Sequence, residues 1–431
     1  MAIDNKDKKV LKSSIEREQN EVACSAECEK IKGSKNLNVP HLRFPEFSGE
    51  WKKCIIQDYG EVITGNTPPT NNAEYYNNGS YLWASPADLG TGKKINDTKT
   101  KLSESGFKKT RIIPKGSILV TCIGSTIGKI GMAVETMSSN QQINSIIVNE
   151  KSNNDFVYYA ISRAFPRYLS EVGVQAVPIL SKSNFEKLPN YTTSIEEQDK
   201  TGYFLNLLDE RIATQNKIID KLQSLIKGLN DFLYTQYGGE VLTSFAELGT
   251  SYSGLSGKSA QDFGSGKPFI TYLNVYSNNV IKENDFQYVA IKDDEKQNVV
   301  KYGDVLFTLS SETPEEVGVG SVYLGKEKVY LNSFCFGIHI TNTEVAFSPY
   351  LSYYVSLTAF RKFIYPYAQG STRFNLCKAD FEKASIKLPT FADQKRIYSV
   401  LGHIDCKIET ERQMLNLYNS QKQYLLRQMF I

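Results

Sequence analysis

The residues that could carry catalysis do not assemble into a catalytic motif. The segment Gly124–Ile130 resembles a phosphate-binding loop, but it lacks the first glycine at the required spacing. It also has Ile130 where magnesium coordination needs a serine or threonine. Cys24 and Cys28 are four residues apart, and no second pair of cysteines or histidines completes a zinc site. The sequence therefore predicts neither a nucleotide site nor a metal site.

The histidines and the absence of a methyltransferase signature also argue against a catalytic site. The three histidines are His41, His339 and His403. None recurs in the internal repeat described below, so we interpret each as a surface or core residue rather than a general base. The signature Asn-Pro-Pro-aromatic of adenine-amino methyltransferases does not occur, and Asn66–Pro69 is interpreted as a turn. The sequence favours binding over catalysis.

A basic run is the main charge feature of the chain. Between Lys93 and Lys115 there are eight basic residues and two acidic residues, Asp97 and Glu104. Such a run can neutralise several phosphates, although a solvated loop face can have the same composition. The net charge of the whole chain is only +3, which neither requires nor forbids nucleic acid.

Length and composition narrow the class of protein. The chain has 431 residues, of which 41% are hydrophobic and 23% charged, so two to four packed domains are expected. No apolar run approaches the roughly 20 residues of a membrane-spanning helix, and the sequence from Met1 shows no apolar signal core. Seven cysteines without a disulfide spacing are typical of reduced thiols. We expect a cytoplasmic protein.

The chain contains an internal repeat with an offset of about 196 residues. Phe185–Lys187 recurs as Phe381–Lys383. Other pairs at the same offset are Gln198 and Gln394, Lys200 and Arg396, Asp209 and Asp405, Arg211 and Lys407, and Ile212 and Ile408. An offset this long indicates domain duplication rather than a solenoid.

Each copy ends in a heptad pattern, which predicts a long helix. The first copy carries it at Leu205, Ile212, Ile219, Ile226 and Leu233, with Leu208, Leu222 and Leu229 three residues on. The second carries it at Leu401, Ile408, Leu415 and Met429, with Ile404, Tyr418 and Leu425 beside them. Such stripes are buried against one another in coiled coils. Gln215 and Glu411 are polar at the same repeat position and Lys422 interrupts the second row, so they either fix the register or lie at a splayed edge.

Outside the two predicted long helices, the residue pattern becomes typical of β-strands. Ser117–Ile123, Ser145–Val148, Val305–Thr308 and Phe336–Ile340 are rich in β-branched or aromatic residues and are bounded by turn residues. Short helical patterns follow around 156–165 and 350–363. The Gly, Ser and Tyr-rich stretch 238–266 is interpreted as a linker and exposed loop. The chain is therefore predicted to form two similar α/β heads, each followed by a long helix.

This duplicated order has a bearing on what the chain binds. The apolar seam from Leu205 to Leu233 is about 42 Å long at roughly 1.5 Å per residue. One turn of duplex DNA spans about 34–36 Å. Two different heads on such helices could each read one short half-site, and an elongated two-headed adaptor for proteins would have the same design.

At this point the residues resemble a known family. The opening segment Pro40–Trp51 resembles the start of the specificity subunits of type I restriction–modification systems, and so do Glu196–Ile212 and Ala392–Ile408. The resemblance covers residues 40 to 431. The sequence departs from the family pattern at Thr193, where the second copy has Pro389, and at His403 and Cys406.

The resemblance implies a fold and a set of domains. The fold is α/β (α+β), with two target-recognition domains separated by two long helices that form an antiparallel coiled coil, related by a pseudo-two-fold repeat. The expected parts are an N-terminal extension (1–39), the first target-recognition domain (40–193), the first spacer helix (194–237), the second target-recognition domain (238–388) and the second spacer helix (389–431).

The resemblance also implies partners. Each head reads one half of a bipartite site in double-stranded DNA, and the helices set the half-site spacing and dock two modification subunits. S-adenosylmethionine belongs to those partners, and ATP and Mg²⁺ belong to restriction subunits that act as motor and nuclease. This chain is then a non-catalytic subunit that binds no cofactor itself.

The residues that contact DNA are predicted from charge and position. For the first head they are Lys93, Lys94, Lys99, Lys101, Lys108, Lys109 and Arg111 toward phosphates, and Ser125, Thr126 and Gln141 near strand ends. For the second head they are Lys258, Lys267, Arg361, Lys362 and Arg373. Arginine can read guanine with two hydrogen bonds, and lysine mostly binds phosphate.

One other hypothesis remains open from the residues alone, and a further one is not supported by them. A two-headed coiled-coil adaptor that binds proteins explains the repeat and the seam, but it leaves the basic run unused. A self-contained methyltransferase-nuclease requires motifs and a chain length that this sequence does not have.

Overall fold

The computed structural model describes residues 38–172 and 179–431. Residues 1–37 of the predicted extension, with Cys24 and Cys28, lie outside this part. Within the described residues no helix has the length and apolar character needed to cross a bilayer. The chain divides into two compact units. The first combines the residues up to Ala213 with Asn416–Ile431, and the second is Thr214–Leu415.

The first unit contains a head (residues 52–192, the first head) built on a five-stranded sheet of order β2-β9-β6-β7-β4. Its strands are β2 (Gly60–Thr64), β4 (Lys94–Ile95), β6 (Ile118–Thr121), β7 (Ile130–Ala133) and β9 (Ile143–Val148). All neighbours pair antiparallel except β4, which runs parallel to β7. The strands predicted around 117–123 and 145–148 are confirmed as β6 and β9, since their β-branched side chains suit a sheet buried on both faces.

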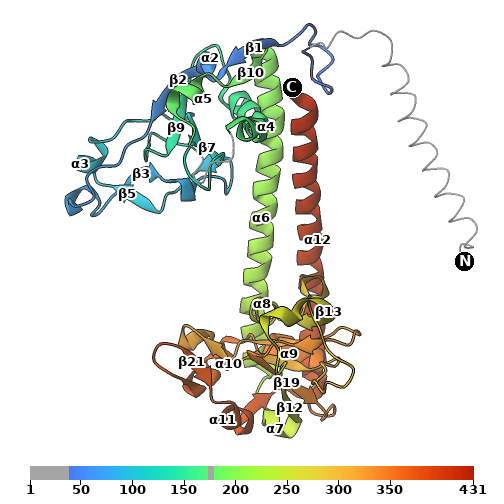
Figure 1. Cartoon of the computed structure of the whole chain (residues 1–431). Helices are drawn as coiled ribbons and strands as arrows, with labels where there is room; N and C mark the ends of the chain where they lie inside the picture. The colour runs from blue at the N-terminus through green and yellow to red at the C-terminus, as the bar shows by residue number, and fades with distance from the viewer. Residues whose placement is uncertain (1–37, 173–178) are drawn as a thin grey trace, which may run out of the picture. The chain divides into compact units, whose positions relative to one another are not determined.

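Two smaller sheets and four helices, of which α4 is the longest, complete the described part of the first head. One sheet has the order β5-β3-β8, from β3 (Tyr81–Ala84), β5 (Thr100–Leu102) and β8 (Ser138–Ser139), and the other pairs β1 (Lys52–Ile55) with β10 (Pro189–Thr192). The helices are α2 (Ile56–Tyr59), α3 (Glu104–Phe107), α4 (Asn154–Val172) and α5 (Lys182–Glu186), with 3-10 turns at Ala73–Tyr75 and Pro86–Asp88. Figure 1 shows α4 beside the long helix α6 (Ile195–Tyr237), and β3, β5 and α3 at the opposite end of this head.

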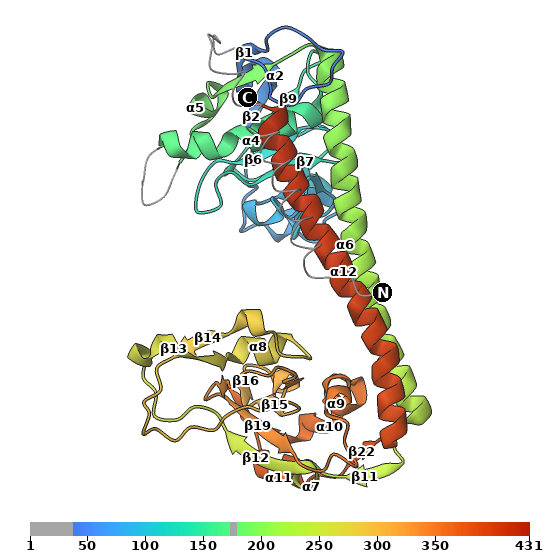
Figure 2. The same ribbon diagram turned by 90° about the vertical axis from the view of Figure 1, so that its right-hand side faces the viewer.

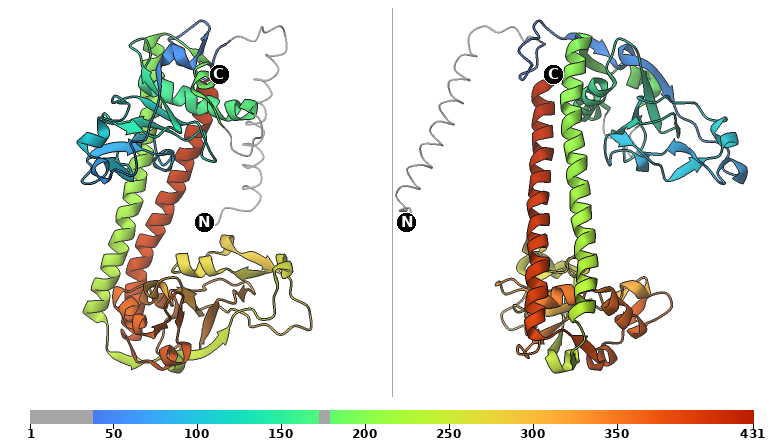
Figure 3. Two further views of the ribbon diagram at one scale, coloured as in Figure 1. Left: turned by 60° about the vertical axis from the view of Figure 1, so that its left-hand side comes forward. Right: turned by 180° about the vertical axis from the view of Figure 1, so that it is seen from behind.

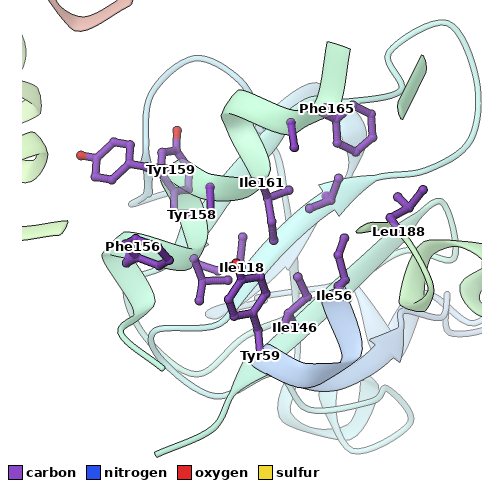
Figure 4. Packing of buried hydrophobic residues seen from close by; sticks show 14 of the residues in the cluster. Ile56, Tyr59, Ile118, Ile146, Phe156, Tyr158, Tyr159, Ile161, Phe165 and Leu188 are labelled. Carbon is purple, nitrogen blue, oxygen red and sulfur yellow. The ribbon is translucent and has the colours of Figure 1, made fainter. Parts of the chain in front are cut away.

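The core of the first head lies between α4 and the large sheet. Phe156 and Ile161 of α4 pack with Ile118 of β6 and Ile146 of β9 (Figure 4). Tyr59 closes the same cluster from α2. The helix α4 therefore carries most of the apolar face that covers this sheet, with smaller contributions from α2 and α5.

The second unit contains a head with the same plan (residues 241–388, the second head). Its large sheet has the order β12-β19-β15-β17, from β12 (Gly249–Ser253), β15 (Val305–Thr308), β17 (Gly320–Val322) and β19 (Cys335–Ile340), all antiparallel. A second sheet joins β13 (Phe263–Ile270), β14 (Gln287–Val289) and β18 (Tyr330–Leu331). Two more sheets join β16 (Ser310–Ser311), β20 (Ala368–Gln369) and β21 (Phe374–Leu376), and β11 (Val241–Thr243) with β22 (Ile386–Leu388).

The helices of the second head are short. They are α7 (Phe245–Leu248), α8 (Tyr272–Ser277), α9 (Ser348–Tyr354), α10 (Thr358–Ile364) and α11 (Lys378–Lys383), with 3-10 turns at Ala260–Asp262, Glu283–Asp285, Pro314–Glu316 and Tyr365–Tyr367. Figure 2 shows α8, β13 and β14 on the side of this head away from β11 and β22.

The prediction that 238–266 is a linker and exposed loop is wrong. This stretch forms β11, α7, β12 and the start of β13. Phe245 and Leu248 of α7 are fully buried in the core of the second head. Four residues of helix and short strands carry too little periodicity to stand out from a Gly-rich sequence, although their apolar side chains are core residues.

The two long helices pair antiparallel within each unit. In the first unit, Leu205 and Leu208 of α6 share a core with Leu425 and Met429 of α12 (Phe391–Met429). In the second unit, residues farther along α6 pack with residues earlier in α12, namely Ile226, Leu229 and Leu233 with Ile397 and Leu401. Figure 3 shows the two helices from two sides. The predicted fold class, with its antiparallel coiled coil, is confirmed.

The polar residues of the seam are paired. In the second unit Gln215 Nε2 donates to the carbonyl of Glu411 at 3.1 Å and also to its carboxylate, and both residues are buried. In the first unit the Lys422 ammonium lies 2.5 Å from Asp209 Oδ1. Gln215 and Glu411 occupy the same position in the two copies, so the repeat brings its own equivalent residues together. A buried polar pair of this kind favours one register over its neighbours.

The duplicated residues attach each head to its own helix. Gln198 accepts from the backbone N–H of Asn153 at 3.0 Å, and Gln394 accepts from that of Phe347 at 2.8 Å. Farther along each helix, the hydroxyl of Tyr159 donates to Asp209 at 2.6 Å. The hydroxyl of Tyr353 donates to Asp405 in the same way. The repeat seen in the sequence is therefore largely a repeat of anchoring contacts.

Replacement of the buried Gln394 by alanine tests this anchoring. Its amide also donates to the carbonyls of Val345 at 2.8 Å and Pro389 at 3.0 Å. Gln394→Ala leaves three backbone groups that are buried or partly buried without this partner, so we expect the free energy of unfolding of the second unit to fall by about 3 kcal/mol. Gln413→Ala, on an exposed position of α12 within the second unit, is the matched control and should change it by less than about 0.5 kcal/mol. Equal effects in calorimetric unfolding would contradict the anchoring role.

Candidate nucleic-acid interface

The basic run of the first head is gathered mainly on its small sheet. Four predicted phosphate-binding residues lie in or beside β5 and α3, and all are exposed: Lys99, Lys101, Lys108 and Lys109. Lys101 pairs with Asp97 at 2.9 Å and Lys108 with Glu104 at 2.6 Å. Exposed pairs of this kind are weak, so a phosphate can replace the carboxylate. These four residues stay predictions for phosphate binding.

Lys94 and Arg111 are exposed beside this group, and each makes one contact within the protein. The Lys94 ammonium lies 3.6 Å from the Glu210 carboxylate, and both side chains are about half exposed. Arg111 Nη1 donates to the carbonyl of Thr64 at 2.7 Å. That bond uses one of the five donors of the guanidinium, so most of it remains available to a ligand.

Lys93 has a different role, and the structure removes it from the candidate set. Its side chain is buried, with the ammonium 2.6 Å from Asp155 Oδ1 and 2.9 Å from Asn206 Oδ1. The same ammonium lies 4.5 Å from the ring centroid of Tyr159. Burial lowers the pKa of Lys93, and the ion pair with Asp155 opposes this. Lys93 thus stabilises the contact between the first head and α6 and cannot reach a phosphate.

The predicted polar contacts of the first head fall on two adjoining loops. Ser125 and Thr126 lie between β6 and β7, and Gln141 lies in the turn between β8 and β9. The N–H of Cys122 donates to the carbonyl of Gln142 at 2.8 Å, which holds the two loops together. Ser125 and Gln141 are exposed and Thr126 is half-buried. Gln141 accepts from the hydroxyl of Thr67 at 2.6 Å.

The second head has the same two loops, joined in the same way. The N–H of Leu309, just after β15, donates to the carbonyl of Phe334 at 2.9 Å. Asn332 Oδ1 accepts from the N–H of Phe334 at 2.9 Å, as Asn140 accepts from Gln142 at 3.0 Å in the first head. The turns are therefore equivalent, although their sequences differ.

A third loop joins this pair in each head. The N–H of Leu376 donates to the carbonyl of Leu309, and the N–H of Leu180 donates to that of Cys122, both at 2.8 Å. In the second head the third loop is the turn between β20 and β21, which carries Arg373. We call the three loops together the three-loop edge: residues 122–129, 140–142 and 179–180 in the first head, and 309–319, 332–334 and 368–376 in the second. Ser125, Thr126, Gln141 and Arg373 all lie on it.

Lys258 and Arg361 in the second head are used by the fold. The Lys258 side chain is almost fully buried, pairs with Glu295 and donates to the carbonyl of Ala290 at 2.7 Å. Arg361 donates to the carbonyls of Glu315, Val317 and Gly318 at 2.6–2.7 Å. It thereby fixes the loop between β16 and β17. Both leave the candidate set, because each side chain is already bonded to groups of the head itself.

The remaining basic candidates of the second head are exposed. Lys267 lies in β13 and Lys362 in α10, and neither makes a hydrogen bond or ion pair through its ammonium within residues 38–172 and 179–431. Lys362 borders a cavity of about 390 Å³ that Lys227 and Tyr365 also line. Lys267 and Lys362 stay predictions for phosphate binding.

A cavity at the three-loop edge of the second head was not predicted. Its volume is about 310 Å³, and it is lined by Tyr272, Leu273, Tyr276, Ser310, Ser311, Glu312, Glu316, Phe334 and Arg373. The loops that form it differ in length from those of the first head, so the offset of the repeat does not hold there. The one feature of the sequence that could have indicated this edge is the Asn332–Phe334 turn, because it repeats the spacing of Asn140–Gln142.

Nothing in the described residues suggests a resident metal. In the part of the chain that the structure describes, no three His, Cys, Asp or Glu side chains are placed to hold a metal ion. The five described cysteines, at Cys54, Cys122, Cys335, Cys377 and Cys406, are all free thiols. Burial raises the pKa of the Cys54 thiol to about 11 and that of the Cys122 thiol to about 12, so neither is a ready nucleophile.

Comparison with known proteins gives matches on both heads. A family model described as a type I restriction modification DNA specificity domain matches residues 48–224 and 249–417. The chain is 30% identical over 182 residues to the type I restriction enzyme MjaIX specificity subunit of Methanocaldococcus jannaschii, which covers 40% of this chain and 42% of that one. It is 29% identical over 186 residues to the HindI specificity subunit of Haemophilus influenzae, covering 41% and 40%. The chain thus spans less than half the length of these two relatives.

A solved structure extends the likeness to the fold of nearly the whole chain. The type I restriction–modification S subunit from M. genitalium matches with a TM-score of 0.52 and 13% identity, covering 91% of this chain and 99% of that one. At this identity the match supports the fold alone.

Charge reversal separates the surface lysines from Lys93. Lys108→Glu with Lys109→Glu should weaken binding to every DNA duplex, and the slope of log affinity against log salt should fall by about one for each phosphate that is no longer neutralised. Lys93→Met should leave that slope unchanged and lower the free energy of unfolding by about 2 kcal/mol, less than for a fully buried pair because Asp155 is 31% exposed. A slope that changes with Lys93→Met would restore it to the DNA-contacting set.

Proposed function

The chain belongs to the family of type I restriction modification DNA specificity domains, and we propose that it is the non-catalytic subunit that directs a type I restriction–modification complex to its DNA sequence. The observation that supports this most is the duplicated head, since both heads match the family model and both carry the three-loop edge. Each head then reads one half of a bipartite site. A protein-binding adaptor gains no support from these matches.

We propose that the long helices dock two modification subunits. Each unit leaves large apolar side chains exposed on the helices. In the second unit they include Ile218, Leu225 and Phe232, spaced seven apart on α6, and in the first unit they include Leu417 and Tyr424 on α12. Exposed apolar rows on a helix are typical of partner surfaces. The pseudo-two-fold repeat suits two identical partners.

The chemistry is proposed to reside on those partners. S-adenosylmethionine would belong to the modification subunits, and ATP and Mg²⁺ to restriction subunits, with no cofactor held by this chain. The free thiols of the described cysteines suit the reducing cytoplasm, and we propose that location for the complex.

DNA binding in the presence of the modification subunit tests the proposal. The chain purified with that partner should bind one split sequence in preference to all others. Its log affinity should fall linearly as log salt rises, because phosphate contacts release counterions. Filter binding or fluorescence anisotropy at several salt concentrations measures both the sequence preference and the salt dependence. Equal affinity for all duplexes in the presence of the partner would contradict the proposal.

A second experiment tests whether the helices set the half-site spacing. Four helix-forming residues are inserted after Ile219 in α6 and four after Lys407 in α12. The Gln215–Glu411 pair stays intact, because Gln215 precedes the first insertion and Glu411 follows the second. Each helix then grows by about 6 Å at 1.5 Å per residue. We expect the preferred spacer between half-sites to grow by a base pair or two, at about 3.4 Å per base pair. An unchanged spacer would show that something else sets it.

A further inference from the structure

The cavity at the three-loop edge of the second head presents an arginine and a carboxylate together. Arg373 reaches it from the loop between β20 and β21, and Glu312 from the loop between β16 and β17. Both residues are exposed. Within the described residues, neither side chain makes a hydrogen bond or an ion pair. Two opposite groups thus face one space with their hydrogen-bonding capacity unused.

An aromatic contact and a tight turn restrain Arg373. Its guanidinium lies over the ring of Phe334, 5.8 Å from the centroid, where a cation is attracted to the aromatic face. Its backbone is held by Gly370, which has a φ of +144°. A Cβ on Gly370 would lie 2.1 Å from the carbonyl oxygen of Arg373, so only glycine fits this turn. The arginine is therefore presented with less loss of conformational entropy than a free surface side chain.

The other carboxylate of the cavity does not compete for Arg373. Glu316 accepts from the hydroxyl of Tyr276 at 2.7 Å and from that of Ser311 at 3.0 Å. These hydrogen bonds, that from Tyr276 first, hold the pKa of Glu316 below its usual value. Glu316 is thus a satisfied part of the wall, and Glu312 is the carboxylate left for a ligand.

Phosphate binding does not account for this pair. A carboxylate repels the DNA backbone, so an unpaired Glu312 on a DNA-contacting edge suits a base amino group instead. Glutamate accepts from the N4 amino group of cytosine, and arginine donates two hydrogen bonds to O6 and N7 of guanine. These two bases form one pair. Guanine alone among the bases offers two acceptors side by side in the major groove.

We propose that the second head reads a G·C pair, with Arg373 on the guanine and Glu312 on the cytosine amino group. The inference rests on the proposed function and names two residues that determine its specificity. In the first head the corresponding loops carry Ser125, Thr126 and Gln141, which have no such charge pair. One half-site therefore contains this G·C pair, and the residues that read it belong to the second head alone.

Selection from a randomised duplex library tests the proposal. The chain, in complex with its modification subunit, is used to select bound duplexes, which are then sequenced. Four versions are compared: the unchanged chain, Arg373→Lys, Glu312→Ala and Lys267→Ala. Arg373→Lys keeps the charge but removes the two parallel donors. Lys267→Ala removes an exposed lysine of the same head and is the matched control. Thermal unfolding of each complex confirms that the fold is kept.

The expected result is a change at one base pair. The unchanged chain should prefer G·C at one position of one half-site by about tenfold or more over other pairs, the discrimination expected from one bidentate contact. Arg373→Lys and Glu312→Ala should each reduce that preference to less than about threefold at the same position and leave the other half-site unchanged. Lys267→Ala should weaken binding to all duplexes and keep the motif.

Two other outcomes overturn the inference at different levels. A bipartite motif that neither Arg373→Lys nor Glu312→Ala relaxes, or that they relax at two different positions, refutes the assignment of the G·C pair while the proposed function stands. No enriched motif with the unchanged chain refutes the proposed function, and the assignment with it.

Discussion

The attachment of each head to its long helix is the constraint on which the rest of this molecule depends. A reader of DNA is specific only if its loops are held in fixed positions, and here a buried glutamine and a tyrosine–aspartate hydrogen bond fix each head. Gln198 with Asp209 does this in the first unit, and Gln394 with Asp405 in the second. These residues are the same in both copies, whereas most residues of the three-loop edges differ, apart from Asn140 with Asn332 and Leu180 with Leu376. The repeat thus preserves the contacts that anchor each head, while the loops are free to differ in sequence.

In the first unit, the segment before the first head also helps to hold that head on its helix. Arg43 donates to both carboxylate oxygens of Glu197 at 2.7 Å, and Trp51 Nε1 donates to the same carboxylate at 3.1 Å. Burial raises the pKa of Glu197, and the hydrogen bonds from Arg43, Thr193 and Trp51 outweigh it, so the net shift is downward. The opening segment that resembles the family is therefore a clamp on the start of α6. It fixes where the first head joins its helix.

The frame could be predicted from the sequence because its signals are periodic or repeated. Heptad rows marked α6 and α12, and β-branched runs marked the central strands of both heads. The α7 segment was missed because Phe245 and Leu248 sit in a four-residue helix inside a Gly-rich stretch. A helix this short has no period to detect, and its burial depends on partners far away in the sequence.

The candidate site was predicted less well, because charge alone does not tell a surface lysine from a buried one. Lys93 and Lys258 look like their neighbours in the sequence, but each has a carboxylate partner brought by another part of the fold: Asp155 and Glu295. The sequence likewise predicts a DNA contact at Arg361, but its guanidinium donates to three carbonyls of one loop. Conversely, Glu312 and Phe334 could be recognised as candidate site residues only from the structure, which places them around one cavity with Arg373. Convergence of separate loops is a tertiary property that spacing does not reveal.

The central claim is that this chain addresses a modification complex to a bipartite DNA sequence. Sequencing of methylated bases in cells with and without the gene for this chain tests it most directly. The account predicts that one split motif loses its methylation when the chain is absent, while all other methylated motifs remain. Methylation that is the same in both strains, with the modification subunit present, would contradict it.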